Sequence, residues 1–319
     1  MRGATGSKNL SGINMKIIEC VPNFSEGCDS RTITAIAAVF KSFPDVQLAD
    51  FSGDADHNRS VFTFLGKPKD VLSAALAACG KALELIDMRK QAGAHPRLGA
   101  VDVVPFIPLG TAKMKDAVDL AHSFGKQLGE RFGVPVYFYG FAARKDPYIE
   151  LPEVRRGGYE GLAEKMMRMK DIPDEGGEKF NAQSGATVVG ARDLLVAYNI
   201  NLASEDMHLA KHIASRIREK GGGLKSVRAI GLMLKSRGVA QVSINLLNCK
   251  ETPLKMVFDR VEIMAAEGGA KILESELIGL APKCAFAGTT PEYLKLKDFD
   301  KHRLLETHLK NFKAFKIKK

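Results

Sequence analysis

The sequence lacks the segments that would place a protein in a membrane or export it. No apolar run approaches the roughly 18 residues needed to cross a bilayer. Residues 1–14 have no hydrophobic stretch like that of a signal peptide and are instead rich in Gly, Ser and Asn. We therefore expect a cytoplasmic protein in which residues 1–14 form a disordered leader.

Cysteine is scarce and never paired in a CxxC spacing. The chain has five cysteines, an odd number, spread over its whole length. They are Cys20, Cys28, Cys79, Cys249 and Cys284. Neither a disulfide framework nor a zinc site is indicated, and reduced thiols are expected.

Three common ligand motifs are also missing. No GxGxxG follows a predicted strand and no GxxxxGK[ST] occurs, which argues against a nucleotide-phosphate cradle. His208 and His212 have the i, i+4 spacing of two metal ligands on a helix, but Leu209 stands where the HExxH motif has Glu. A surface pair is favoured, and a helix-borne metallohydrolase remains the alternative.

Half of the net charge of +10 comes from the C-terminus. Residues 291–319 hold nine Lys and Arg against four Asp and Glu. A solvated, basic C-terminal helix is the favoured explanation of this tail, and nucleic-acid binding through the tail is the minor alternative. We therefore expect no nucleic-acid partner and no membrane partner.

Hydrophobic periodicity predicts the same order of elements twice. In the first half, strand, helix, strand, strand, helix and strand are expected at residues 16–21, 31–42, 46–51, 60–66, 70–88 and 101–107, followed by a helix at 114–132 and a strand at 134–139. In the second half, the corresponding ranges are 194–202, 206–220, 227–234, 240–247, 254–267 and 271–278.

This repeated βαββαβ order predicts an α/β fold, an α+β sandwich of two ferredoxin-like subdomains. Helices cover one face of such a sheet, and the other face must also be buried. Two such faces in one chain favour sheets that face each other across a ligand tunnel. The division between the halves is expected near residues 187–192, after a Pro-, Gly- and charge-rich stretch at 149–183.

The most unusual local string is GAHPRLGAVDVVPFIP at residues 93–108. Glycines and a proline bracket His95 and Arg97 just before a strand that should be buried, so the turn can present a side chain into a cleft. A histidine can accept and return a proton near neutral pH. The competing interpretation is that His95 only hydrogen-bonds its own turn.

Two other loops are rich in polar groups. The loop at residues 52–59 suits a metal less well than an anion, and Asn58 and Arg59 are candidate donors to a substrate carboxylate. The segment DEGGEKFNAQSGATVVGAR at residues 174–192 joins the proposed halves. Its glycines allow close approach to a flat ring or an anion, but a plain linker is equally compatible.

Several strings together resemble the glutamate formiminotransferase family. They are ECVPNFSEG at 19–27, the Asn58-Arg59 pair, LIDMRKQAGAHPRLGAVDVVPFIP at 85–108, VPVYFYG at 134–140, GATVVGAR at 185–192 and AQVSINLLN at 240–248. The resemblance covers about residues 15–285 in order. It is to the stand-alone enzyme, or to the transferase part of formiminotransferase-cyclodeaminase.

The resemblance implies transfer of the formimino group from N-formimino-L-glutamate to N5 of tetrahydrofolate, a reaction of histidine degradation and one-carbon metabolism. His95 occupies the position of the family's catalytic residue, and Asn58, Arg59 and Arg97 would bind substrate. The implied folate-binding residues are Gly176, Gly177, Glu178, Lys179, Phe180, Asn181, Ala182, Gln183, Ser184, Gly185 and Ser52. Tetrahydrofolate, with or without a polyglutamate chain, would be a cosubstrate, and no metal is implied.

This chain departs from the family pattern at two positions. Ser52 stands where the family has an aspartate, with Asp50 and Asp54 the nearest carboxylates, and Ser184 replaces an aromatic residue. Phe180 is the candidate to replace the aromatic contact. The alternative activities are glutamate formyl transfer at the same site and folate binding with weak catalysis.

We expect four regions in all. Residues 1–14 form the leader, 15–190 the N-terminal subdomain, 191–290 the C-terminal subdomain and 291–319 a basic helical tail. The sequence leaves the oligomeric state open between a monomer and a homodimer.

Overall fold

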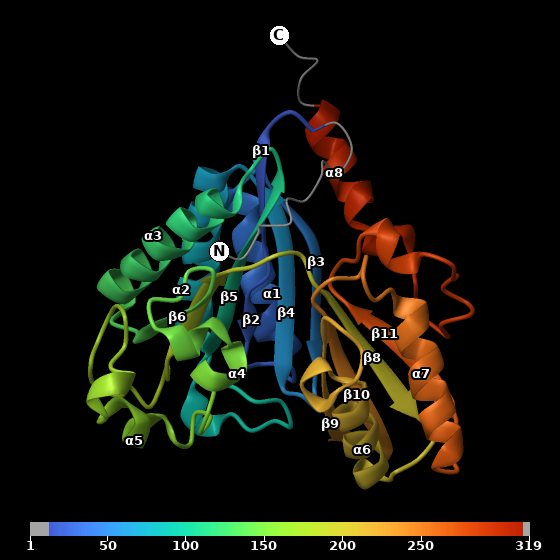
Figure 1. Cartoon of the computed structure of the whole chain (residues 1–319). Coiled ribbons are helices and arrows are strands. Elements are labelled where there is room, and N and C mark those ends of the chain that lie inside the picture. The colour runs from blue at the N-terminus through green and yellow to red at the C-terminus, as the bar shows by residue number, and fades with distance from the viewer. Residues whose placement is uncertain (1–12, 315–319) are drawn as a thin grey trace. The chain divides into compact units, whose positions relative to one another are not determined.

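The computed structural model describes residues 13–314, so the predicted leader up to residue 12 and the last five residues of the tail lie outside the described part. The chain forms two compact units (Figure 1). Of the described residues, the first unit contains 13–193 and 311–314, and the second is Leu194–Lys310.

The first unit begins with a ferredoxin-like motif. Its elements are β1 (Lys16–Cys20), α1 (Ser30–Ala38), β3 (Val46–Asp54), β4 (Arg59–Gly66), α2 (Pro68–Leu85) and β5 (Val101–Gly110). The four strands pair antiparallel in the order β5-β1-β4-β3, which is the ferredoxin-like arrangement. The two-residue strand β2 (Asn23–Phe24) pairs with both β4 and β5.

Two further strands extend this sheet beyond β5. The chain continues through α3 (Met114–Phe132) to β6 (Val136–Gly140), and β7 (Thr187–Ala191) then inserts between β5 and β6, parallel to both. All five residues of β7 are buried. The segment at which we expected the two halves to divide is therefore an inner strand of the first unit's sheet. The boundary between the two compact units falls after Asp193.

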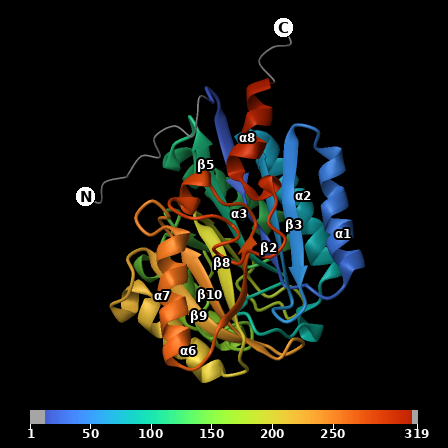
Figure 2. The same ribbon diagram turned by 90° about the vertical axis from the view of Figure 1, so that its right-hand side faces the viewer.

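Burial on both faces explains why β7 is apolar after its first residue, Thr187, as is typical of parallel strands. One face of the sheet packs on α1, α2 and α3 around side chains such as Phe62, Phe106 and Phe124. Figure 2 shows α1 and α2 next to each other beside β3. The other face of β5, β7 and β6 is covered by the 149–183 stretch, which contains α4 (Leu151–Val154) and α5 (Leu162–Met166).

The second unit is a complete ferredoxin-like domain. Its elements are β8 (Val196–Leu202), α6 (Met207–Ile217), β9 (Val227–Leu234), β10 (Val239–Leu246), α7 (Leu254–Glu267) and β11 (Ile272–Ile278). The strands pair antiparallel in the order β11-β8-β10-β9. The predicted α/β class with two ferredoxin-like subdomains is confirmed.

Local signals fix where the helices begin and end. The Asp29 carboxylate caps α1, and the Asp206 carboxylate accepts from the first amides of α6. α3 ends at Gly133, whose φ of 64° favours glycine. The predicted helix at 31–42 is α-helical only in its first part. From Val39 to Ser42 the chain forms a 3-10 turn, whose hydrogen bonds span three residues instead of four.

The segment after β11 differs from the continuous helix that we expected at 291–319. Within residues 291–314, only α8 (Leu305–Ala314) and a 3-10 turn, Lys301–Arg303, are helical. Before them, Leu294 is fully buried in the core of the second unit, and Leu296 bridges to Ser275 of β11. This part of the tail is therefore packed structure rather than a solvated extension.

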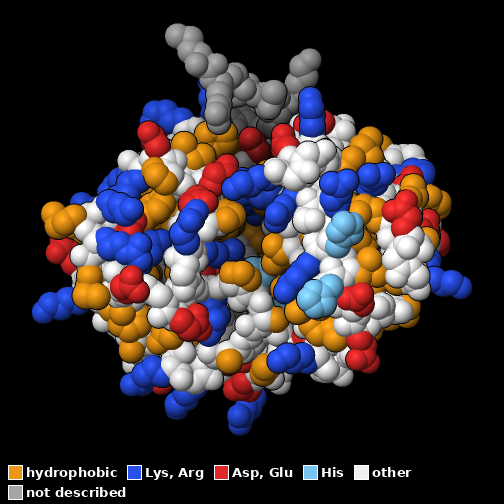
Figure 3. Space-filling view, turned by 60° about the horizontal axis from the view of Figure 1, so that its bottom comes forward, with side chains coloured by type: hydrophobic (Ala, Val, Ile, Leu, Met, Phe, Trp, Pro, Cys, Tyr) orange, Lys and Arg blue, Asp and Glu red, His pale blue; other side chains and the backbone are white. Residues whose placement is uncertain are grey.

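Charged side chains are interspersed on the face drawn in Figure 3, where Lys and Arg lie among Asp and Glu. Among the described residues, no helix has both the length and the apolar character needed to cross a membrane.

Candidate functional site

The His95 turn is docked tightly on two neighbouring segments of the first unit. A Cβ on Gly93 would lie 2.3 Å from the His57 carbonyl oxygen, so only glycine lets the turn reach the β3–β4 connection. A Cβ on Gly99 would lie 2.4 Å from the Ser184 carbonyl oxygen. The two bracketing glycines thus hold His95 between the β3–β4 connection and the segment before β7.

Asn58 links three segments beside this turn. Its side-chain amide donates to Gln91 Oε1 at 2.5 Å and to the Ala92 carbonyl at 2.9 Å, and its oxygen accepts from the Gly27 amide at 2.9 Å. Gln91 in turn donates to Glu26 at 3.0 Å. We expected Asn58 to donate to a substrate carboxylate, but the structure directs both of its amide hydrogens into the protein.

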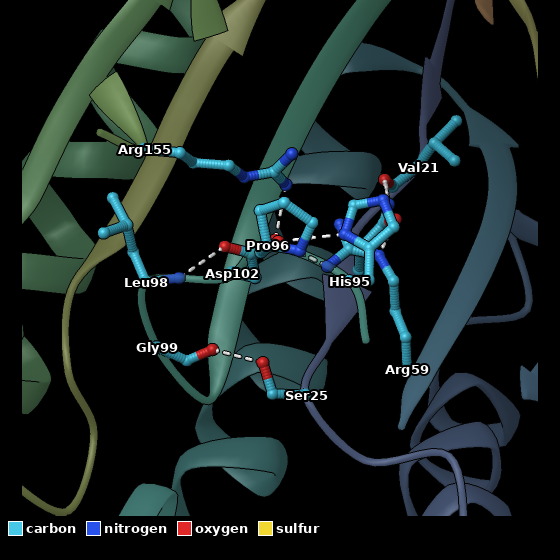
Figure 4. A network of polar contacts seen from close by, with 10 residues as sticks. Val21, Ser25, Arg59, His95, Pro96, Leu98, Gly99, Asp102 and Arg155 are labelled. Carbon is cyan, nitrogen blue, oxygen red and sulfur yellow. Dashed lines mark hydrogen bonds and ion pairs between the residues drawn. The ribbon is translucent and has the colours of Figure 1, made fainter. Parts of the chain in front are cut away.

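A buried ion cluster lies beside His95 (Figure 4). Asp102, on β5, is fully buried. Its Oδ2 accepts hydrogen bonds from Arg59 Nη1 at 2.6 Å and from Arg155 Nη2. Its Oδ1 accepts from the Leu98 amide at 2.9 Å. Arg59 also donates to Asn23 Oδ1 at 2.9 Å. Arg59 was a predicted site residue, whereas Asp102 and Arg155 were not.

The pKa values in this cluster follow from burial and charge. Burial raises the pKa of Asp102, but Arg155 and Arg59 outweigh that effect and hold it at about 2. Burial lowers the pKa of Arg59 to about 10, so both partners stay charged at neutral pH. With two guanidinium groups and one carboxylate, the cluster carries a net positive charge.

His95 itself is half-buried, with its ring near this cluster (Figure 4). Nδ1 lies 2.9 Å from the Pro96 carbonyl oxygen. A carbonyl can only accept, so this contact places the proton of the neutral ring on Nδ1 and leaves the Nε2 lone pair free.

Burial lowers the pKa of His95 well below its usual value, and the charges of Arg59 and Arg155 lower it further. The ring is therefore a neutral base at pH 7. Once protonated, it would release the proton readily.

Arg97 is held in place by its own contacts. Its Nη2 donates to the Gln91 carbonyl at 2.9 Å and to Glu160 at 2.8 Å, and its guanidinium carbon lies 6.0 Å from the centre of the Tyr159 ring. Arg97 Nε is buried without a hydrogen-bond partner among the described residues.

Two other buried nitrogens near His95 are also unpartnered within the described chain. They are Arg155 Nε and His57 Nε2, and the His57 ring centre is 5.8 Å from that of His95. Buried polar groups nearly always have a partner, so these three nitrogens mark places for water or a ligand.

The end of the predicted folate-binding stretch reaches the His95 turn. The Ser184 carbonyl accepts from the Ala100 amide at 2.8 Å, and Gln183 accepts from the Met88 amide at 2.9 Å. Phe180 packs on Tyr159, with ring centres 5.8 Å apart, and Arg97 lies over the same tyrosine. This segment and the His95 turn therefore form one surface of the first unit.

The beginning of the stretch lies elsewhere. Gly176 packs against Gly129 and the Val134 carbonyl at the end of α3, and Gly177 lies beside Gly133. The structure thus brings the second half of the stretch to His95, but not these first glycines. Ser52 lies on β3, paired with Val61, on the sheet face that also carries Arg59.

Among residues 13–314, no group of three or more His, Cys, Asp or Glu side chains is arranged to hold a metal ion. His208 and His212, the pair with metal-ligand spacing, are both exposed on α6.

The structure thus combines two ferredoxin-like units with a buried charged cluster beside a neutral histidine, and comparison with known proteins gives the family. Residues 17–192 match the N-terminal subdomain of the formiminotransferase domain, and residues 197–308 match the formiminotransferase domain. The chain belongs to the formiminotransferase family, which confirms the predicted family and enzyme class.

Curated relatives agree with this assignment. A glutamate formimidoyltransferase of Streptococcus pyogenes is 41% identical over 92% of this chain and 99% of its own length. One from Thermoplasma acidophilum is also 41% identical, over 92% of this chain and 97% of its own. The chicken formimidoyltransferase-cyclodeaminase is 44% identical over 88% of this chain, which spans about half (53%) of that longer protein.

Proposed function

We propose that this chain transfers the formimino group from N-formimino-L-glutamate to N5 of tetrahydrofolate, giving 5-formiminotetrahydrofolate and L-glutamate, with His95 as the acid-base residue. The similarity to glutamate formimidoyltransferases over nearly their whole length supports the reaction. The free Nε2 of a neutral His95 beside a buried cationic cluster is the observation that supports the site.

The reaction has to move one proton between two nitrogens. N5 attacks the formimino carbon, forming a C–N bond and acquiring a positive charge, while the C=N π bond opens onto the imino nitrogen. His95 Nε2 accepts the N5 proton from this tetrahedral intermediate. The imino nitrogen's lone pair then re-forms C=N as the bond from that carbon to the glutamate nitrogen breaks, and His95 returns the proton to this nitrogen. Glutamate leaves as an amine, and the ring is neutral again.

The depressed pKa of His95 suits both steps. It keeps the ring unprotonated before the attack, and it makes the imidazolium a strong enough acid to protonate the leaving nitrogen promptly. Arg59 and Arg155 contribute to this through their charge, while Asp102 holds both guanidinium groups in place.

The remaining polar groups can orient the substrates. Both substrates carry carboxylates, and Arg97 Nε and Arg155 Nε, which have no hydrogen-bond partner within residues 13–314, are the candidate donors to them. In the folate-binding stretch, Phe180 and Tyr159 supply aromatic surface where Ser184 has replaced the family's aromatic residue. We assign Asn58 a positioning role, because its amide holds Gln91 and the start of the His95 turn.

The decisive experiment is an assay of purified protein with tetrahydrofolate and N-formimino-L-glutamate, run in parallel with N-formyl-L-glutamate. We expect a higher kcat/KM for the formimino substrate. Faster use of the formyl substrate would assign formyl transfer instead. Tight folate binding with turnover of neither substrate would overturn a catalytic role.

A further inference from the structure

Two thiols meet in the second unit, far along the chain from the His95 turn. Cys249 lies in the turn after β10, and Cys284 lies in the 3-10 turn Lys283–Phe286 that follows β11. Their sulfur atoms are 3.7 Å apart. The reaction proposed above uses neither of them.

We propose that Cys249 and Cys284 form a reversible disulfide, a redox modification site that responds to peroxides. Sulfur atoms 3.7 Å apart must approach to about 2.05 Å. Both cysteines lie in turns rather than in the sheet or in α7, so side-chain rotation and small backbone shifts can supply the difference.

The two thiols differ in the way that a peroxide-reactive pair requires. Cys284 is half-buried, so an oxidant can reach it, whereas Cys249 is buried at the edge of the core. The hydrogen bond from Cys249 lowers the pKa of Cys284 against the effect of burial, and Lys250 adds to the lowering. The lowered pKa increases the share of Cys284 present as thiolate, which is the reactive form.

The chemistry balances with hydrogen peroxide as the oxidant. The Cys284 thiolate attacks one peroxide oxygen, the O–O bond breaks, and hydroxide leaves to become water, which converts Cys284 to a sulfenic acid. Cys249 sulfur then attacks the Cys284 sulfur. The S–O bond breaks, and a second water leaves with the Cys249 proton.

The other three cysteines lack this combination. Cys20 and Cys79 are fully buried, and burial raises the pKa of both. Cys28 is exposed, but desolvation and the nearby Glu26, Asp54 and Asp56 raise its pKa. At neutral pH, iodoacetamide should therefore alkylate half-buried Cys284 faster than exposed Cys28, the reverse of the order that exposure alone predicts.

The test treats the full-length protein with hydrogen peroxide, blocks free thiols and maps the peptides by mass spectrometry. We expect one cross-linked peptide joining Cys249 to Cys284, a mass loss of about 2 Da, and full reversal by dithiothreitol. The bond should also raise the melting temperature by a few degrees, because it closes a loop around α7 and β11.

Two single variants separate the roles. Cys249→Ser should abolish the cross-link and leave Cys284 to oxidise further to a sulfinic acid, while Cys28→Ser should leave the cross-link unchanged. Complete alkylation of both Cys249 and Cys284 after peroxide treatment would overturn the proposal. So would a cross-link that persists in Cys249→Ser.

Discussion

At the scale of single residues, the proposed chemistry rests on the free Nε2 of His95. His95→Gln keeps a polar side chain but cannot move a proton, so kcat should fall by about a hundred- to ten-thousand-fold with folate binding still measurable. Steady-state kinetics and a folate titration check this. His208→Gln, on the exposed face of α6, is the matched control and should retain normal turnover.

Near-normal turnover in His95→Gln would remove His95 from the mechanism. Loss of activity in His208→Gln together with bound metal would favour the metallohydrolase interpretation instead.

The pH dependence of the reaction should follow the His95 pKa. Only neutral His95 can accept the N5 proton, so kcat/KM should fall as the pH drops through the His95 pKa, which lies below the usual 6.5. Activity should therefore be retained at pH 6.5 and decline only in more acidic buffer. A decline that begins above pH 7 would contradict the lowered pKa.

Arg155→Gln tests the charge that lowers this pKa. Removing the cation should raise the His95 pKa, so the acidic limb of the kcat/KM profile moves to higher pH. Arg155→Lys keeps the charge, so the acidic limb of its kcat/KM profile should lie at the same pH as in the unmodified protein. The neighbouring Arg156, exposed and paired with Glu153, provides the control Arg156→Gln. A fall in activity without a shifted limb would indicate a merely structural role for Arg155.

The site was only partly predictable at this scale. His95, Arg97 and Arg59 could be proposed because their types and turn contexts suit proton transfer and anion binding. The sequence also carries a signal for Asp102, because a carboxylate inside the apolar run AVDVVPF must have a buried partner. Arg155 had none, because its partner is 53 positions away and only the fold brings them together.

At the scale of elements, the close approach of Gly99 to the segment before β7 should be essential. In Gly99→Ala the new Cβ would lie 2.4 Å from the Ser184 carbonyl oxygen and 2.5 Å from the Ala186 carbonyl oxygen. Both are backbone atoms, so relieving the clash requires the backbone to shift. We expect a loss of about 1–3 kcal/mol in the free energy of unfolding, together with weaker folate binding. Urea denaturation and a folate titration measure both.

Gly133→Ala is the comparison for this variant. That position has a φ of 64° but open space around its Cβ, so only backbone strain of about 1 kcal/mol is expected, with folate binding unchanged. Equal effects of the two variants on folate binding would argue against a specific role for the contact at Gly99.

Hydrophobic periodicity predicts most of the strands and helices, but it does not predict β7. The strands and helices of both βαββαβ motifs have clear alternation or 3.6-residue spacing, and they were predicted to within a few residues. The β7 segment TVVGA is only five residues long, contains a glycine and follows a glycine-bearing stretch, so a linker is as compatible with it as a strand. Its parallel pairing with β5 and β6 depends on contacts that no local pattern encodes.

At the scale of the whole molecule, the position of the basic residues decides whether net charge indicates a nucleic-acid partner. About half of the +10 charge lies in residues 291–319, and Lys and Arg elsewhere are mixed with Asp and Glu on the face shown in Figure 3. Truncation before Pro291 should therefore remove any retention on heparin. Retention that survives the truncation would place a basic binding surface on the body of the protein.

The same truncation should also destabilise the second unit, because part of the tail is core. Leu294 is fully buried among residues of the second unit, and Ser275 Oγ donates to its carbonyl at 2.5 Å. Leu294→Ala, which leaves the tail charge intact, should lower the free energy of unfolding by about 2–5 kcal/mol and leave heparin retention unchanged.

Tyr293→Ala, at the neighbouring half-exposed position, should lower the free energy of unfolding by less than Leu294→Ala. Urea denaturation of the two variants separates packing from charge, and equal stability of Leu294→Ala and the unmodified protein would show that the tail is not part of the core.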